Sequence, residues 1–87
     1  MIRRYIVKGH SMEPNFNDGD KLLLSSLFFK LKSGDAVVFG SGSRDYLKRI
    51  VAATAKNKFI AVGDNKVHSS KYAITRKQVK GKFLMKY

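Results

Sequence analysis

Residues 32–53 read KSGDAVVFGSGSRDYLKRIVAA, and the order of turn and strand signals in this stretch decides the fold. It opens with the turn signal KSGD at Lys32–Asp35 and continues into a compact apolar run, Ala36–Phe39, that is typical of a strand. The glycines and serines of Gly40–Ser43 predict a hairpin connection, after which a second strand is expected from about Arg44 to Ala52. The stretch therefore predicts a β-hairpin.

Similar signals flank this hairpin on both sides. Toward the N-terminus, strands are predicted at Ile2–Lys8 and Lys21–Ser26, joined by a loop that ends in the turn signal NDGD at 17–20. Toward the C-terminus, strands are predicted at Phe59–Val62 and Val79–Met85, with a polar loop between them. The sequence contains no convincing amphipathic helix. We therefore predict an all-β fold, a coiled β-sheet or small, partly open barrel, in a single domain of residues 1–87.

The composition is strongly basic. Eighteen Lys and Arg residues face six acidic ones, for a formal net charge of +12, and half of the basic residues follow residue 55. Such a charge attracts polyanions, either nucleic acid or an anionic lipid surface, although it also fits a solvated face with no ligand. Because the chain has no cysteine, disulfides, thiolate metal sites and a cysteine nucleophile are excluded.

No stretch of the sequence predicts a membrane span or a secretory leader. A span needs about 20 apolar residues, and the richest run, Leu22–Leu31, is interrupted by two serines and a lysine. The N-terminus, MIRRYIVKGH, has no apolar segment of the kind that a leader carries. We therefore expect a cytoplasmic protein or one bound peripherally to a membrane.

Two side chains have the chemistry of a serine hydrolase. Ser11 lies in GHSMEP, between a predicted strand and a Pro-containing turn, and a serine hydroxyl becomes a nucleophile when a neighbouring base takes its proton. Lys48 lies within an otherwise apolar strand, on the same face as Tyr46 and Ile50. Loss of hydration there would favour the neutral amine, and the neighbouring Arg49 would act in the same direction. Ser11 as a turn residue and Lys48 reaching out to solvent are the structural alternatives.

A third stretch, VGDNKVHSS at 62–70, reads alone as a turn with a hydroxyl four residues after its asparagine. In this order, however, the stretches resemble the signal peptidase I family. GHSMEP is similar to the family's Ser-Met-x-Pro box, NDGDKLLL and KSGDAVVF to its two Gly-Asp strands, YLKRIV to its Lys-Arg box and VGDN to its Gly-Asp-Asn box. The resemblance covers about Tyr5 to Lys82 and implies the fold shared with LexA-type self-cleaving repressors.

The resemblance implies a role for each matching residue. Ser11 would be the nucleophile, Lys48 its general base, and Ser69 the hydroxyl that orients the amine of Lys48. The Ser11 N–H and the backbone of Gly9 and His10 would form the oxyanion and substrate loop. Asp64 and Asn65 would support the site. The implied activity is a serine endopeptidase that cleaves extended precursor or leader peptides after small residues, with no metal and no cofactor.

The sequence departs from the family pattern at three positions. Many members carry a hydroxyl where Gly9 stands, and after the Gly-Asp-Asn box Lys71 replaces an aspartate and Ala73 an arginine. Shallow apolar pockets for the substrate would be lined by residues near the serine box. The candidates are Ile6, Val7, Met12, Phe16 and Leu24, for which core packing is the alternative.

Other readings remain open. A catalytically silent basic β-domain could bind nucleic acid by stacking bases on aromatic residues, namely Phe28, Phe29, Tyr72 and Tyr87. Within the peptidases, the alternatives are a soluble maturation enzyme, a self-cleaving regulator, or a peptidase held on an anionic membrane through its basic face and Leu27–Phe29. His10 and His68 lie far apart without clustered carboxylates, so they predict surface residues and no metal site.

Overall fold

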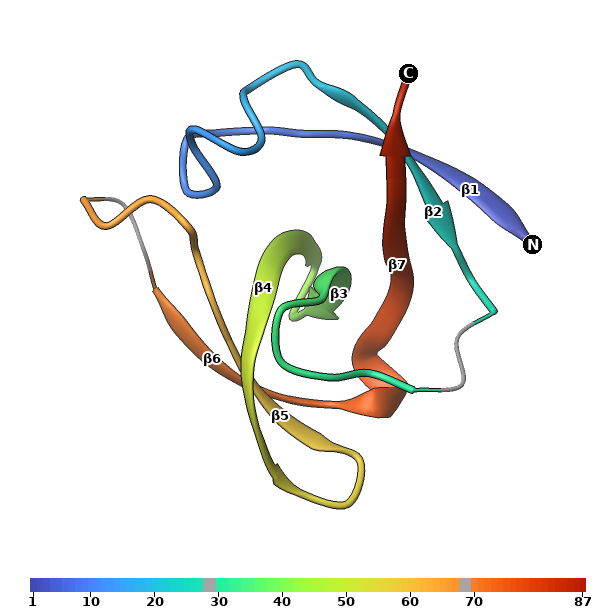
Figure 1. The fold of residues 1–87 in the computed structure, drawn as a ribbon, viewed down its shortest axis with the longest axis vertical. Helices are drawn as coiled ribbons and strands as arrows, with labels where there is room; N and C mark the ends of the chain where they lie inside the picture. Colours follow the sequence, from blue (N-terminus) through green and yellow to red (C-terminus); the bar gives the residue numbers. More distant parts are fainter. Residues whose placement is uncertain (28–29, 68–69) are drawn as a thin grey trace.

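The computed structural model describes residues 1–27, 30–67 and 70–87. Within them the chain forms strands and one short 3₁₀ helix (Figure 1). In chain order these are β1 (Ile2–Ile6), β2 (Lys21–Ser25), β3 (Ala36–Ser41), β4 (Arg44–Ala55), β5 (Lys58–Val62), β6 (Lys71–Thr75), η1 (Arg76–Gln78) and β7 (Val79–Lys86).

The seven strands of the described residues form one antiparallel sheet in the order β1-β2-β7-β3-β4-β5-β6. The last strand, β7, lies between β2 and β3 and so joins the N-terminal pair to the predicted hairpin of β3 and β4. The sheet is open, because its edge strands β1 and β6 are not paired with each other in the described part of the chain. The prediction of an all-β fold is confirmed.

The central strand β3 has a hydrophobic core on each of its faces. Ala36 and Val38 belong to one core, which also contains the buried residues Val7, Met12, Phe16, Leu22, Leu24 and Leu47. Val37 and Phe39 belong to the other, with Leu31, Ile50, Phe59, Ala61, Ile74 and Val79. Strand alternation explains this division. Figure 1 accordingly shows β1, β2 and β7 on one side of β3 and β5 and β6 on the other.

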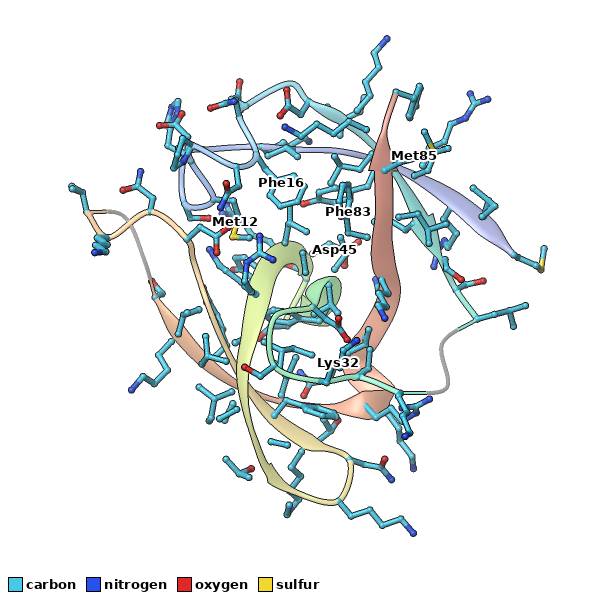
Figure 2. The ribbon with its side chains drawn as sticks, viewed as in Figure 1. Met12, Phe16, Lys32, Asp45, Phe83 and Met85 are labelled. Carbon is cyan, nitrogen blue, oxygen red and sulfur yellow. The ribbon has the colours of Figure 1, made fainter. Side chains whose placement is uncertain are left out.

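The first core holds the long loop between β1 and β2 in place. Figure 2 shows Met12 and Phe16 of this loop turned toward the interior, where the ring of Phe16 meets Phe83 of β7 edge to face at 4.8 Å. The base of the loop is closed by two backbone bonds, from Val7 N to Asp20 O (2.9 Å) and from Gly19 N to Val7 O (2.8 Å). A loop fixed at its base and by two buried side chains can hold a functional group at a set position.

The strand that the sequence did not predict is β6, which falls within the expected polar loop. Of its residues only Ile74 is buried, so no run of apolar residues marks it. It forms because every residue from Lys71 to Thr75 pairs with β5. The predicted turn at Lys32–Asp35 is present, whereas the predicted connection Gly40–Ser43 is shorter than expected, because β3 continues to Ser41 and leaves Gly42 and Ser43 as the turn. Gly34 and Gly42 take positive φ angles in these turns.

No helix long and apolar enough to cross a membrane occurs in the described ranges.

Candidate functional site

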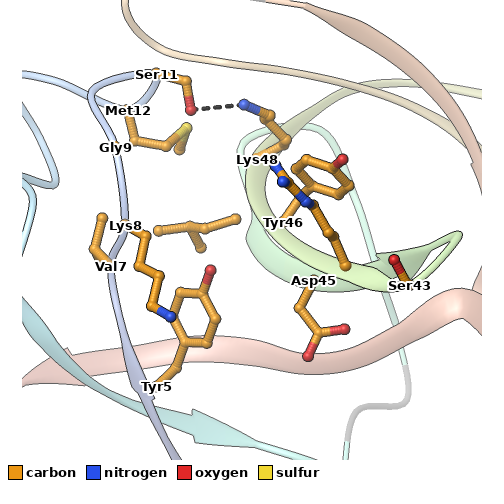
Figure 3. Close-up of a pocket in the computed structure, with 12 residues that line it drawn as sticks. Tyr5, Val7, Lys8, Gly9, Ser11, Met12, Ser43, Asp45, Tyr46 and Lys48 are labelled. Carbon is orange, nitrogen blue, oxygen red and sulfur yellow. Dashed lines mark hydrogen bonds between the residues drawn. The ribbon is translucent and has the colours of Figure 1, made fainter.

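Ser11 and Lys48, predicted as a pair, are in direct contact. The amine Nζ of Lys48 donates a hydrogen bond of 2.6 Å to the hydroxyl Oγ of Ser11, although the two residues lie 37 positions apart (Figure 3). Ser11 is held on the loop between β1 and β2, whereas Lys48 projects from β4, where it is paired with Val37 of β3. The fold thus brings a hydroxyl and an amine within the distance needed for direct proton transfer.

The surroundings of Lys48 favour its neutral form. Only 6% of the residue is exposed, and burial lowers the pKa of its amine from the ordinary value of 10.5. The aromatic ring of Tyr72, on β6, lies 5.8 Å from Nζ and belongs to a group of three packed rings with Phe39 and Tyr46. The expected contribution of Arg49 is not among the causes of this shift.

The charge of Arg49 is instead matched by Asp64. The guanidinium donates two bonds to this carboxylate, from Nε to Oδ1 (2.9 Å) and from Nη2 to Oδ2 (2.8 Å), and a third from Nη1 to the Gly34 carbonyl (2.8 Å). Asn15 Nδ2 also donates to Asp64 Oδ2 at 2.9 Å. Burial alone would raise the pKa of Asp64, but the bonds from Arg49 and Asn15 outweigh it, so the pKa is lowered.

The segment Gly63–Asn65, which reads as a simple turn in the sequence, fastens the Ser11 loop. The backbone N–H of Asn65 donates to the Ser11 carbonyl (2.8 Å), and its side-chain Nδ2 donates to the His10 carbonyl (2.9 Å). A Cβ on Gly63 would lie 2.5 Å from the Ser11 carbonyl oxygen, so no side chain fits there. We call Gly63–Asn65, together with Arg49 and Asn15, the loop clamp.

The amide groups around Ser11 differ in their hydrogen bonding. The N–H of Gly9, which has φ of 87°, donates to Asp18 Oδ1 at 2.7 Å. The N–H of Ser11 donates no hydrogen bond to any described residue. His10 is exposed, and its Nδ1 lies 2.6 Å from Glu13 Oε2, which raises the pKa of the imidazole. As far as the described residues go, the Ser11 N–H is thus unbonded, whereas the Gly9 N–H is bonded to Asp18.

A cavity of about 560 Å³ opens beside the Ser11–Lys48 pair. Val7 and Met12 line it, two of the five residues considered as substrate-binding candidates. Phe16 and Leu24 are buried in the first core and Ile6 is exposed, and none of these three lines the cavity. The remaining lining residues are Tyr5, Lys8, Gly9, Ser11, Ser43, Arg44, Asp45, Tyr46, Leu47 and Lys48.

The remaining residues singled out in the sequence fall into two groups. Ser69 and His68 fall outside the described residues, as do Phe28 and Phe29. Lys71 and Ala73, where the sequence departs from the family pattern, are exposed on β6, on either side of Tyr72. Among residues 1–27, 30–67 and 70–87, no three His, Cys, Asp or Glu side chains are grouped in a way that could hold a metal ion.

Sequence reasoning missed the contributions of Gly63, Asn15 and Tyr72. A glycine required for lack of space gives no signal in a single sequence when it also fits a turn, and Asn15 lies 49 residues from its partner Asp64. Tyr72 was considered only as a surface for stacking bases. Its packing against Phe39 and Tyr46 depends on β6, the strand that was not predicted.

The amino-acid sequence is similar to that of known proteins. The chain is 33% identical over 55 residues to "Signal peptidase IB" of Staphylococcus aureus strains Mu50, N315 and MW2. The match covers 59% of this chain and 29% of the relatives, so the chain spans well under half of their length. The family described as "Signal peptidase, peptidase S26" matches residues 1–83. Since this match extends over almost the whole chain, the protein belongs to the signal peptidase family, peptidase S26.

Proposed function

We propose that the chain is a serine endopeptidase domain of signal peptidase type in which Ser11 is the nucleophile and Lys48 the general base. The observation that carries the proposal is the 2.6 Å contact between Ser11 Oγ and a buried amine whose pKa is lowered. A hydroxyl needs a base with an available lone pair, and only a neutral amine provides one. Membership of the signal peptidase family supports the same chemistry.

The reaction follows from these positions. Neutral Lys48 accepts the Ser11 proton as Oγ attacks the carbonyl carbon of the substrate, and the backbone N–H of Ser11 donates to the developing oxyanion. Lys48 then gives the proton to the leaving amine, the peptide C–N bond breaks, and an ester on Ser11 remains. A water molecule, deprotonated by Lys48, hydrolyses this ester and restores the hydroxyl. Ser69, by the family resemblance, would orient the amine.

The cavity supports an extended peptide as substrate. One wall is formed by residues 5, 7–9, 11 and 12 and the other by residues 43–48, with the hydroxyl and the amine between them at one end (Figure 3). The family resemblance implies a small residue before the cut, and the buried apolar side chains of Val7 and Met12, which line the cavity, would form the pocket for it. The proposed class of substrate is a precursor or leader protein that contains such an extended segment.

The experiment is a cleavage assay on unstructured peptides that contain small residues, with Ser11→Ala and Lys48→Met as test variants. The matched controls are Ser33→Ala and Lys58→Met, which remove an exposed serine and an exposed lysine outside the cavity. We expect both test variants to lose at least about 1,000-fold in kcat and both controls to keep the wild-type rate. Full activity in Ser11→Ala or Lys48→Met would refute the proposal.

The pH dependence gives an independent check. Because protonated Lys48 cannot act as the base, the rate should rise as pH increases through the lowered pKa of the amine. A rate that does not change with pH, or that falls from about pH 6 upward, would contradict a lysine base.

A further inference from the structure

The cavity beside Ser11 and Lys48 extends to a second end with a different chemical character. Figure 3 shows Tyr5, Lys8 and Asp45 grouped away from the Ser11–Lys48 contact, at the far end of the same hollow. Ser43, in the hairpin turn, and Arg44, the first residue of β4, also line the cavity. At the other end Met12 lies next to Ser11, whereas Val7 lies beside Lys8 (Figure 3).

The charge at the far end is positive. The one carboxylate there, Asp45, is paired with Lys80 Nζ at 2.7 Å, so its charge is already compensated. Lys8 and Arg44 are exposed and line the cavity, and neither side chain has a carboxylate or other hydrogen-bond partner among the described residues. Two cations that face a cavity without a partner favour an anionic group in it.

Tyr5 adds a neutral donor to these two cations. Its side chain is half-buried against the first core, and its hydroxyl makes no hydrogen bond within the described residues. Burial, followed by the nearby charge of Asp45, raises the pKa of this phenol above 10.0, so the hydroxyl keeps its proton. A protonated phenol can donate to a carboxylate oxygen and discriminates against an apolar side chain.

Strand spacing locates this end relative to the bond that would be cut. Arg44 and Lys48 are four residues apart on β4, which corresponds to about 13 Å at roughly 3.3 Å per residue. An extended peptide advances by the same amount per residue, so the far end lies three to four residues from the carbonyl next to Ser11. The opposite wall runs in the same direction, from Tyr5 at the far end to Ser11.

We propose that Lys8, Arg44 and Tyr5 select peptides that carry an acidic side chain three or four residues from the cleaved bond. This inference rests on the proposed peptidase function and adds the chemical class of the substrate. The selectivity comes from two charge-assisted contacts near solvent, so it is moderate: about threefold to tenfold in kcat/KM for Glu over Gln at that position. It decreases as ionic strength rises.

The experiment compares peptides that differ only in the position of one glutamate. Each peptide carries Glu, or Gln as its neutral match, at one of the positions one to six residues from the cleaved bond, on either side of it. The test protein combines Lys8→Gln with Arg44→Gln. The charge-matched control combines Lys58→Gln with Lys71→Gln, both exposed and outside the cavity. Because the whole chain carries +12, the control is needed to remove the general attraction of acidic peptides.

We expect the ratio of kcat/KM for the Glu peptide to that for the Gln peptide to be highest at the third or fourth position in the wild type and in the control. In the test protein this ratio should fall to about one. An equal preference at all positions, or an equal loss in the control, would overturn the inference. If no peptide is cleaved in a Ser11-dependent way, the proposed function fails. The same peptides are then titrated against the Ser11→Ala protein, where equal binding of the Glu and Gln peptides would overturn the inference separately.

Discussion

Replacing Gly63 by alanine tests whether the loop clamp sets the position of Ser11. The new Cβ would lie 2.5 Å from the Ser11 carbonyl oxygen, whereas ordinary contact begins at about 3.4 Å, so the two segments must separate by about 0.9 Å. The separation lengthens the 2.8 Å bond from Asn65 N to the same oxygen. A displacement of about 1 Å in a reacting group costs roughly 100-fold in rate, so kcat should fall by about that factor.

The assay is peptide cleavage with a thermal melt of the same samples. Overpacking costs about 1–3 kcal/mol, so the melting temperature should fall while the protein stays folded at 25 °C. The matched control is Gly40→Ala, whose Cβ would meet only the flexible end of Lys80 at 3.2 Å and of Asp45 at 3.5 Å. If Gly63→Ala retained the wild-type kcat, or lost activity only in proportion to its unfolded fraction, the clamp would not position Ser11.

Three further predictions concern charge at the site. Lys48→Met should raise the free energy of unfolding at neutral pH, because burial penalises the ammonium form of Lys48. The difference in unfolding free energy from the wild type should shrink as pH rises toward the ordinary lysine pKa of 10.5, and urea melts that show a constant difference across this range would refute the prediction. Asp64→Asn should lower the free energy of unfolding by about 2 kcal/mol at pH 7, because it breaks the ion pair with Arg49. In chemical melts this difference should disappear as pH falls through the pKa of Asp64, which is lowered below the ordinary 3.8. Tyr72→Ala should move the pH–activity profile to higher pH, because water admitted to Lys48 raises the pKa of its amine, whereas Tyr72→Phe should leave the profile in place. A shift of the Tyr72→Ala profile to lower pH would mean instead that the ring acts mainly by attracting the charged amine.

The parts of the fold that follow from the sequence are those with local signals. The hairpin of β3 and β4 is predictable because Gly40–Ser43 separates two apolar runs. The strand β6 is not, since its single buried residue, Ile74, gives no periodic pattern. The position of β7 between β2 and β3 depends on tertiary packing, and no local pattern in the sequence predicts it.

The candidate site also contains features that the sequence predicts and features that it does not. Alternation alone left Lys48 undecided, because both faces of its strand carry apolar residues, and the structure gives the reason: Leu47 belongs to one core and Ile50 to the other. The pairing of Lys48 with Ser11 was predicted from the family resemblance and not from spacing. In the loop clamp, Asn65 and Asp64 contact residues that are 15 to 55 positions away in the sequence, and a turn motif does not predict such long-range contacts.

The register of the β3–β4 hairpin decides which of two adjacent basic residues, Lys48 or Arg49, contacts Ser11. Lys48 is paired with Val37 and Arg49 with Ala36, and this pairing directs the lysine to the serine hydroxyl and the arginine to Asp64. A slip of one residue would exchange the directions of these side chains. An arginine next to Ser11 could not accept its proton, because a guanidinium stays charged at any pH the protein tolerates. Because the length and geometry of a hairpin turn set the register of its strands, the turn at Gly42, where φ is 62°, helps to direct Lys48 rather than Arg49 to Ser11.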